Sequence, residues 1–180
     1  MIRIMAVVVP RRIPEELQKR GIDAESLIID YLARLLELDP EATAQSHLEL
    51  ALRYLEEGKR LIEKDPAQSS EKLYKAAEES VKALTTYLNL KEILEDVEKN
   101  GRWSIARLEK AVVKISQKLG SQFRSWWDTA WALHVWGFHE AKLDTEDVRM
   151  RLLDIESIVL EAQKIIEGDK QTTKPMRKNQ

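Results

Sequence analysis

Apolar residues recur at steps of three and four along most of the chain, which is the pattern of amphipathic helices. The clearest run is Ala24, Leu27, Ile28, Tyr31, Leu32, Leu35 and Leu38. Similar runs predict long helices over residues 14–38, 41–63, 67–88, 105–119, 122–142 and 145–166, and a shorter one over 91–99. Gly21 is a point where the first of these helices could break.

Proline and glycine mark most of the predicted boundaries. Asp39-Pro40 and Asp65-Pro66 are helix starts, because Asp accepts from free backbone N–H groups and Pro fits the first helical position. Asn100-Gly101 is a stop or turn. Gly120 and Gly168 lie where helices are expected to end.

One apolar stripe and one charged face on each long helix predict an all-α fold. The expected architecture is an antiparallel helical bundle of about six to seven helices. The expected organisation is an N-terminal arm (1–13), a single helical bundle domain (14–168) and a disordered, polar and mildly basic tail (169–180). A helical repeat is disfavoured, because stepping about 34 residues finds no second copy of the 41–88 hairpin.

Composition excludes several classes of function. With 43% hydrophobic and 33% charged residues and a net charge of −2, the chain has no general affinity for nucleic acid or anionic membranes, although local patches could bind either. No run approaches the roughly 20 apolar residues of a membrane span, and residues 1–10 are too short for a secretory signal. No membrane partner is therefore expected. The absence of cysteine excludes thiol chemistry and favours a cytoplasmic setting.

Residues 126–140, WWDTAWALHVWGFHE, hold four of the five tryptophans and two of the three histidines. On an α-helical wheel most of the aromatic side chains fall on one broad arc, which predicts a core face. Trp136 falls on the polar side instead. An exposed tryptophan indicates a contact surface, of which a dimer seam is the simplest kind.

The two histidines of this segment have different environments on the wheel. His134 lies in the apolar arc, which is typical of a histidine whose hydrogen bonds are satisfied within the core or an interface. His139 lies on the polar arc near Asp128 and roughly in line with Arg124, and Arg124 and Asp128 are four apart and can pair. This cluster of arginine, carboxylate and imidazole would suit acid–base chemistry at neutral pH, and an ordinary solvated helix face would look the same.

Other chemical signatures are missing from the sequence. A spacing of five places His134 and His139 about 140° apart on an unbroken α-helix, whereas zinc helices use a spacing of four. Only a break at Gly137 would bring the rings together, so no metal site and no cofactor are predicted. Arg102 belongs to a weak basic cluster that would make a modest phosphate-contacting surface.

Three segments carry a resemblance to a known family: SHLELALRYLEEGKRLIEKDPAQSSEKLYKAAEESVKAL, NGRWS and WALHVWGFHEAKLDTEDVR. With them, residues 14–166 closely resemble the archaeal PaREP proteins, a repeat-associated family. That family is similar in turn to the HEPN superfamily. The HEPN resemblance implies a bundle that pairs as a homodimer, and in many members metal-independent ribonuclease or toxin activity. Its active site is an Arg followed, after four to six residues, by a His.

In this sequence His139 matches the motif histidine, but the position five residues earlier is His134 rather than arginine. The motif is therefore not intact, and two hypotheses stay open. The first is a homodimeric interaction module that binds a protein, RNA or a nucleotide, with Trp136, Asp128 and Arg102 as binding residues. The second is a divergent metal-independent ribonuclease, with His139 as acid and base and His134 or Arg124 as the phosphate-binding group.

Overall fold

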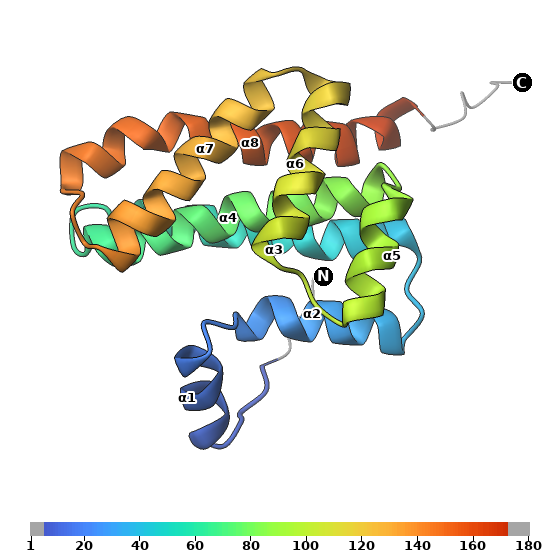
Figure 1. Cartoon of the computed structure of the whole chain (residues 1–180), viewed down its shortest axis with the longest axis horizontal. Coiled ribbons are helices and arrows are strands. Elements are labelled where there is room, and N and C mark those ends of the chain that lie inside the picture. Colours follow the sequence, from blue (N-terminus) through green and yellow to red (C-terminus); the bar gives the residue numbers. More distant parts are fainter. Residues whose placement is uncertain (1–5, 173–180) are drawn as a thin grey trace, which may run out of the picture. The chain divides into compact units, whose positions relative to one another are not determined.

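The computed structural model describes the backbone of residues 6–172 and the side chains of residues 6–168. The described residues are all-α, with helices and connecting turns and no strand (Figure 1). The helices are α1 (Arg12–Lys19), α2 (Ala24–Leu35), α3 (Pro40–Leu61), α4 (Pro66–Tyr87), α5 (Lys91–Asn100), α6 (Ile105–Leu119), α7 (Gln122–Ala132), the π-helix η1 (Leu133–His139) and α8 (Thr145–Thr172).

The chain divides into two compact units, Met1–Leu38 and Asp39–Gln180, whereas the sequence suggested one domain from 14 to 168. The first unit contains α1 and α2. The helix predicted over 14–38 is broken at Gly21, whose φ of +63° is in the left-handed region. The side chain of Asp23 then caps α2 by accepting from the backbone N–H of Ser26 at 2.9 Å.

The second unit begins with an antiparallel hairpin of α3 and α4, and both predicted Asp-Pro starts are confirmed. Asp39 accepts from the N–H of Ala42 at 2.8 Å, and Asp65 accepts from the N–H of Gln68 at 3.0 Å. In each helix the proline takes the first position, where no N–H is required.

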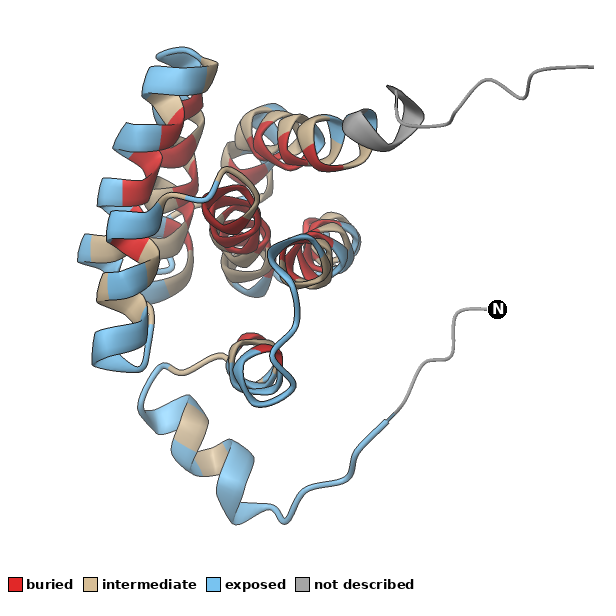
Figure 2. Ribbon diagram, turned by 90° about the vertical axis from the view of Figure 1, so that its right-hand side faces the viewer, coloured by how far each residue is buried: buried red, intermediate tan, exposed pale blue. Residues whose placement is uncertain are grey.

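Helix α4 is the centre of the second unit. It packs against α3, α6, α7, η1 and α8, and fourteen of its residues are buried. Around it, the helices of this unit turn their buried surfaces inward and their charged surfaces outward (Figure 2). The core is therefore a set of apolar stripes gathered on one central helix, as the periodicity predicted.

Two predictions about the chain ends need correction. Helix α8 runs through Gly168 to Thr172, so Gly168 does not end it and residues 169–172 of the expected tail are helical. The rest of that tail, 173–180, lies outside the described residues, as do residues 1–5 of the expected arm. Residues 6–10 have no regular secondary structure, and α1 already begins at Arg12.

The helix predicted over 122–142 is the largest departure from expectation. It is α-helical only to Ala132, continues as the π-helix η1 to His139 and then turns. This change and the break at Gly21 raise the count above the expected six to seven helices. In the part of the chain that the structure describes, every helix is too short or too polar to cross a lipid bilayer.

Candidate functional site

The π-helix brings the two histidines of the tryptophan-rich segment together. The hydrogen bonds of a π-helix join residues five apart, so residues at that spacing lie on adjacent turns of one face. The Nε2 atoms of His134 and His139 are 3.1 Å apart, within hydrogen-bonding distance. The separation of about 140° expected from α-helical geometry is therefore wrong for this segment.

Gly137, inside the π-helix, allows η1 to approach α4 closely. A Cβ atom at this position would lie 2.2 Å from Oγ and 2.5 Å from Cβ of Ser70. Ser70 is itself held in place, because its hydroxyl donates to the carbonyl of Pro66 at 2.8 Å. Only glycine fits there, so the residue that the sequence suggested as a break point is a contact point between two helices.

A carboxylate on α4 completes a hydrogen-bonded chain. Glu71 Oε2 lies 2.8 Å from His134 Nδ1, and the two side chains are 14% and 18% exposed. An ionised carboxylate only accepts, so Nδ1 of His134 carries the hydrogen and its Nε2 accepts from His139. In the neutral pair, Nδ1 of the exposed His139 is then left with a free lone pair.

Aromatic rings hold His134 in this orientation. The ring of Tyr74 stacks on it at 4.1 Å between centroids and 28° between planes, and the ring of Trp131 lies 5.3 Å away. Burial, together with the negative charges of Glu78 and Glu71, raises the pKa of Tyr74 above its ordinary value. Tyr74 therefore stays neutral at physiological pH and acts as a wall of the site.

The structure brings together only part of the predicted site. His134 and His139 form its centre, whereas Arg124 and Asp128 are exposed on α7 and hydrogen-bond to neither histidine among the described residues. Ten residues of helix separate Arg124 from His134, or about 15 Å along the axis. Arg102 is exposed in the turn between α5 and α6.

Trp136 is 50% exposed, which agrees with its place on the polar side of the wheel. It lies in the same π-helix as both histidines. The two residues that sequence reasoning missed are Glu71 and Tyr74, which come from α4, about sixty positions earlier in the chain. Neither belongs to a local motif, so only the packing of η1 on α4 reveals them.

No group of three or more His, Asp and Glu side chains among the described residues is arranged to hold a metal ion. At the histidine pair, the Nε2 atoms are directed at each other and Nδ1 of His134 is directed at Glu71. The site therefore links an exposed imidazole through a second imidazole to a partly buried carboxylate.

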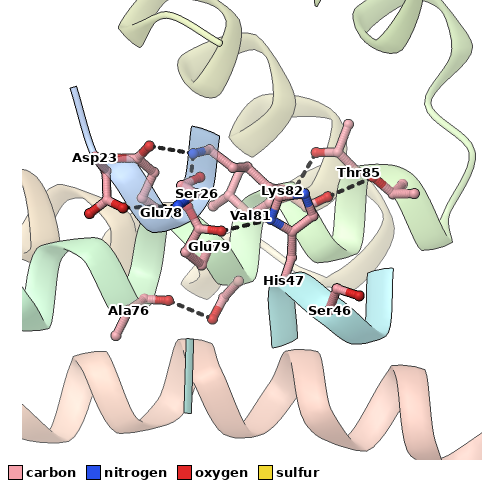
Figure 3. A network of polar contacts seen from close by, with 12 residues as sticks. Asp23, Ser26, Ser46, His47, Ala76, Glu78, Glu79, Val81, Lys82 and Thr85 are labelled. Atoms are coloured by element: carbon pink, nitrogen blue, oxygen red, sulfur yellow. Dashed lines mark hydrogen bonds and ion pairs between the residues drawn. The ribbon is translucent and has the colours of Figure 1, made fainter. Parts of the chain in front are cut away.

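A second polar cluster, with a buried centre, joins α3 to α4 (Figure 3). Glu79 lies 2.6 Å from His47 Nδ1 and 2.8 Å from Lys82 Nζ, and Lys82 also contacts Glu78 at 2.6 Å. Burial raises the pKa of Glu79, whereas the charge of Lys82 and the hydrogen bond from His47 lower it. The lowering is the larger effect, so the pKa of Glu79 lies well below 4.5. The side chains of His47, Glu79 and Lys82 are at most 4% exposed, so a substrate cannot reach them.

Comparison with known proteins gives a matching family model and solved structures that resemble this chain. The model of the archaeal PaREP1/PaREP8 family matches residues 46–159. The crystal structure of a Sulfolobus solfataricus protein, structural-genomics target SsR10, is 39% identical, with a TM-score of 0.59 over 63% of this chain and 93% of that one. The solution structure of target SsR10 is likewise 39% identical, with a TM-score of 0.58 over 65% and 91%. No curated protein matches the chain.

Proposed function

The chain belongs to the archaeal PaREP1/PaREP8 family, and we propose that it is a metal-independent ribonuclease in which His139 acts as acid and base. The observation that carries the proposal is the hydrogen-bonded chain Glu71–His134–His139. These hydrogen bonds select one tautomer of the His139 imidazole and leave its Nδ1 able to take a proton.

The hydrogen-bonded chain also places a negative charge behind the histidine pair. As His139 removes a proton from the substrate in the transition state, the carboxylate of Glu71, acting through His134, opposes the positive charge that develops. Glu71 and His134 are mostly buried, and water screens their interaction less than it would at the surface. His139 itself is exposed and can reach a substrate.

The proposed reaction needs no group beyond these. His139 removes the proton from a ribose 2′-hydroxyl, and the 2′-oxygen attacks phosphorus while the bond to the 5′-oxygen breaks. The proton then passes from the imidazolium to the departing 5′-oxygen. The products are a 2′,3′-cyclic phosphate end and a 5′-hydroxyl end.

Resemblance to the HEPN superfamily supports RNA as the substrate and a homodimer as the active form. His134 stands five positions before His139, where the HEPN motif places its arginine. In the hydrogen-bonded chain Nε2 of His134 accepts from His139, so His134 is neutral there and orients His139 rather than supplying the positive charge of the arginine. Arg124, the other candidate for the phosphate-binding group, is too far along α7 to take this role.

The test is cleavage of single-stranded RNA in the presence of a chelator by wild-type protein and by His139→Ala. We expect the variant to be slower by about 100-fold or more, since general acid–base catalysis contributes at least that much. Glu140→Ala is the matched control, because Glu140 is the exposed neighbour on the same turn and should leave the rate unchanged. Product RNA should carry a cyclic phosphate.

Glu71→Gln tests the positioning role. Glutamine can still hydrogen-bond to His134 but cannot oppose the positive charge that develops on the histidine pair, so the rate should fall and the pH–rate profile should shift. A purely structural role would lower the rate without shifting the profile. Cleavage that persists in His139→Ala, or that stops with chelator, would contradict the proposal.

The second candidate is the interaction module, and the exposure of Trp136 favours it. An exposed indole in the same π-helix as the histidine pair is a surface on which a base or a partner side chain can stack. This candidate predicts RNA binding without cleavage, and weaker binding by about tenfold in Trp136→Ala, as for loss of one stacked base. Trp126→Phe is the control, because Trp126 lies partly buried on α7.

A further inference from the structure

The first unit has an apolar surface that its own two helices leave uncovered. Seven large apolar residues within α2 and just beyond its end are between 37% and 62% exposed: Leu27, Ile28, Tyr31, Leu32, Leu35, Leu36 and Leu38. The buried residues of α2 are Ser26 and Ala33, which lie on another face of the helix. The chain thus buries the small residues of α2 and exposes the large ones, the reverse of an ordinary surface helix.

The exposed residues follow the spacing of a helix that pairs with another helix. Within α2, Ile28, Tyr31 and Leu35 recur at steps of three and four, which is the repeat of a two-helix seam. Leu38 follows beyond the end of the helix. Leu27 and Leu32 flank this seam and widen it. A stripe of this kind fits lengthwise against a second helix that carries the same stripe.

The size of the surface fits a stable pair. About half of each of seven large side chains amounts to roughly 600 Å² per copy, so two copies would bury about 1,200 Å², the lower end of stable interfaces. Val7, Val8 and Ile13 are also more than half exposed and add to the apolar surface of this unit. An apolar patch of about 600 Å² is at the upper end of what monomeric proteins expose, and patches of that size are often interaction surfaces.

Charge argues against a membrane or a nucleic acid as the occupant. The polar residues of α2 are mainly acidic: Glu25 and Asp30 against Arg34, with Glu37 just beyond its end. Helices that lie on anionic membranes carry Lys and Arg on their polar face, and nucleic-acid contacts need the same charge. A second copy of the stripe would pack apolar residues against apolar residues, so it needs no basic side chains.

We propose that α2 is the dimerisation helix of this protein, and that its exposed stripe pairs with the same stripe of a second copy about a twofold axis. Such an interface is self-complementary and closed, so association stops at two. The stripe lies before residues 46–159, which the family model matches. The proposed interface therefore belongs to the N-terminal unit and not to the part of the chain that the family model covers. The inference does not depend on the proposed ribonuclease activity.

The first experiment is the mass of the full-length protein in solution at micromolar concentration, by light scattering after size-exclusion chromatography. Wild-type protein should be a dimer, and Leu35→Glu should weaken dimerisation at least 100-fold and run as a monomer, because it buries an unpaired charge in the seam. Leu153→Glu on α8 is the matched control, because Leu153 is 70% exposed and lies outside the stripe. Circular dichroism checks that each variant is folded.

The second experiment uses the absence of cysteine from the natural chain. Tyr31 is the middle residue of the seam, so two copies of it come close whether the two helices run parallel or antiparallel. Tyr31→Cys should form a disulfide-linked dimer under mild oxidation, and Leu153→Cys should not. A monomeric wild-type protein, or a dimer that Leu153→Glu breaks and Leu35→Glu does not, would overturn the proposal.

Discussion

His134 and His139 are hydrogen-bonded through their Nε2 atoms at 3.1 Å, although an α-helix would turn their side chains to different faces. The contact depends on one π-helical segment, which Gly137 allows to approach α4. The proposed chemistry of the site therefore depends on a backbone feature seven residues long.

Gly137→Ala tests this dependence. The added methyl group would meet Ser70 at 2.2 Å, so η1 must move away from α4. We expect a loss of about 1–3 kcal/mol in the free energy of unfolding, as for overpacked cores. Chemical denaturation measures the loss, and the imidazole NMR signals of both histidines should shift as their contact is broken.

The control for that substitution is Gly168→Ala. Gly168 lies within α8, and a Cβ there meets nothing within 4 Å. Alanine should therefore leave stability unchanged or increase it by up to about 1 kcal/mol. Equal effects of the two substitutions would show that Gly137 has no special packing role.

Nitrogen-15 NMR of the imidazoles tests the hydrogen-bonded chain without any assay of activity. At a pH where both rings are neutral, His134 should carry its hydrogen on Nδ1 and His139 on Nε2, because the carboxylate of Glu71 only accepts. Glu71→Gln should reduce this preference, because the amide offers both a donor and an acceptor. A mixture of tautomers in the wild-type protein would contradict the assignment.

The buried cluster around Glu79 should be costly to break. Lys82→Met removes a close cation from Glu79, whose side chain is only 2% exposed. We therefore expect the free energy of unfolding to fall by about 3–5 kcal/mol. Lys72→Met on the same helix is the comparison, since its ion pair with Glu57 is about a third exposed and should cost about 1 kcal/mol. Urea denaturation at neutral pH measures both.

The same cluster predicts how stability depends on pH. The pKa of Glu79 is lower in the folded than in the unfolded chain, so its contribution is fully present above about pH 4.5 and is lost as pH falls toward the folded pKa. Wild-type protein should lose stability steeply in that window. Glu79→Gln should be less stable at pH 7 and should lose less on acidification, which urea unfolding from pH 7 to about pH 3 would show.

The sequence by itself determined the helical class, the starts of α3 and α4, and the location of the core. These follow from local chemistry: Asp39 and Asp65 cap the helices that they precede, and apolar residues at steps of three and four form the faces that pack on α4. It also placed Trp136 on the exposed side and drew attention to both histidines.

Tertiary structure alone decided the site. The approach of Gly137 to Ser70 accompanies a π-helix where the sequence pattern is α-helical, and it aligns the two imidazoles. Glu71 and Tyr74 join them from a helix more than sixty positions away, and Arg124 is left outside. Periodicity records which face of a helix is buried, but which side chains meet across two helices depends on their packing, which no local pattern encodes.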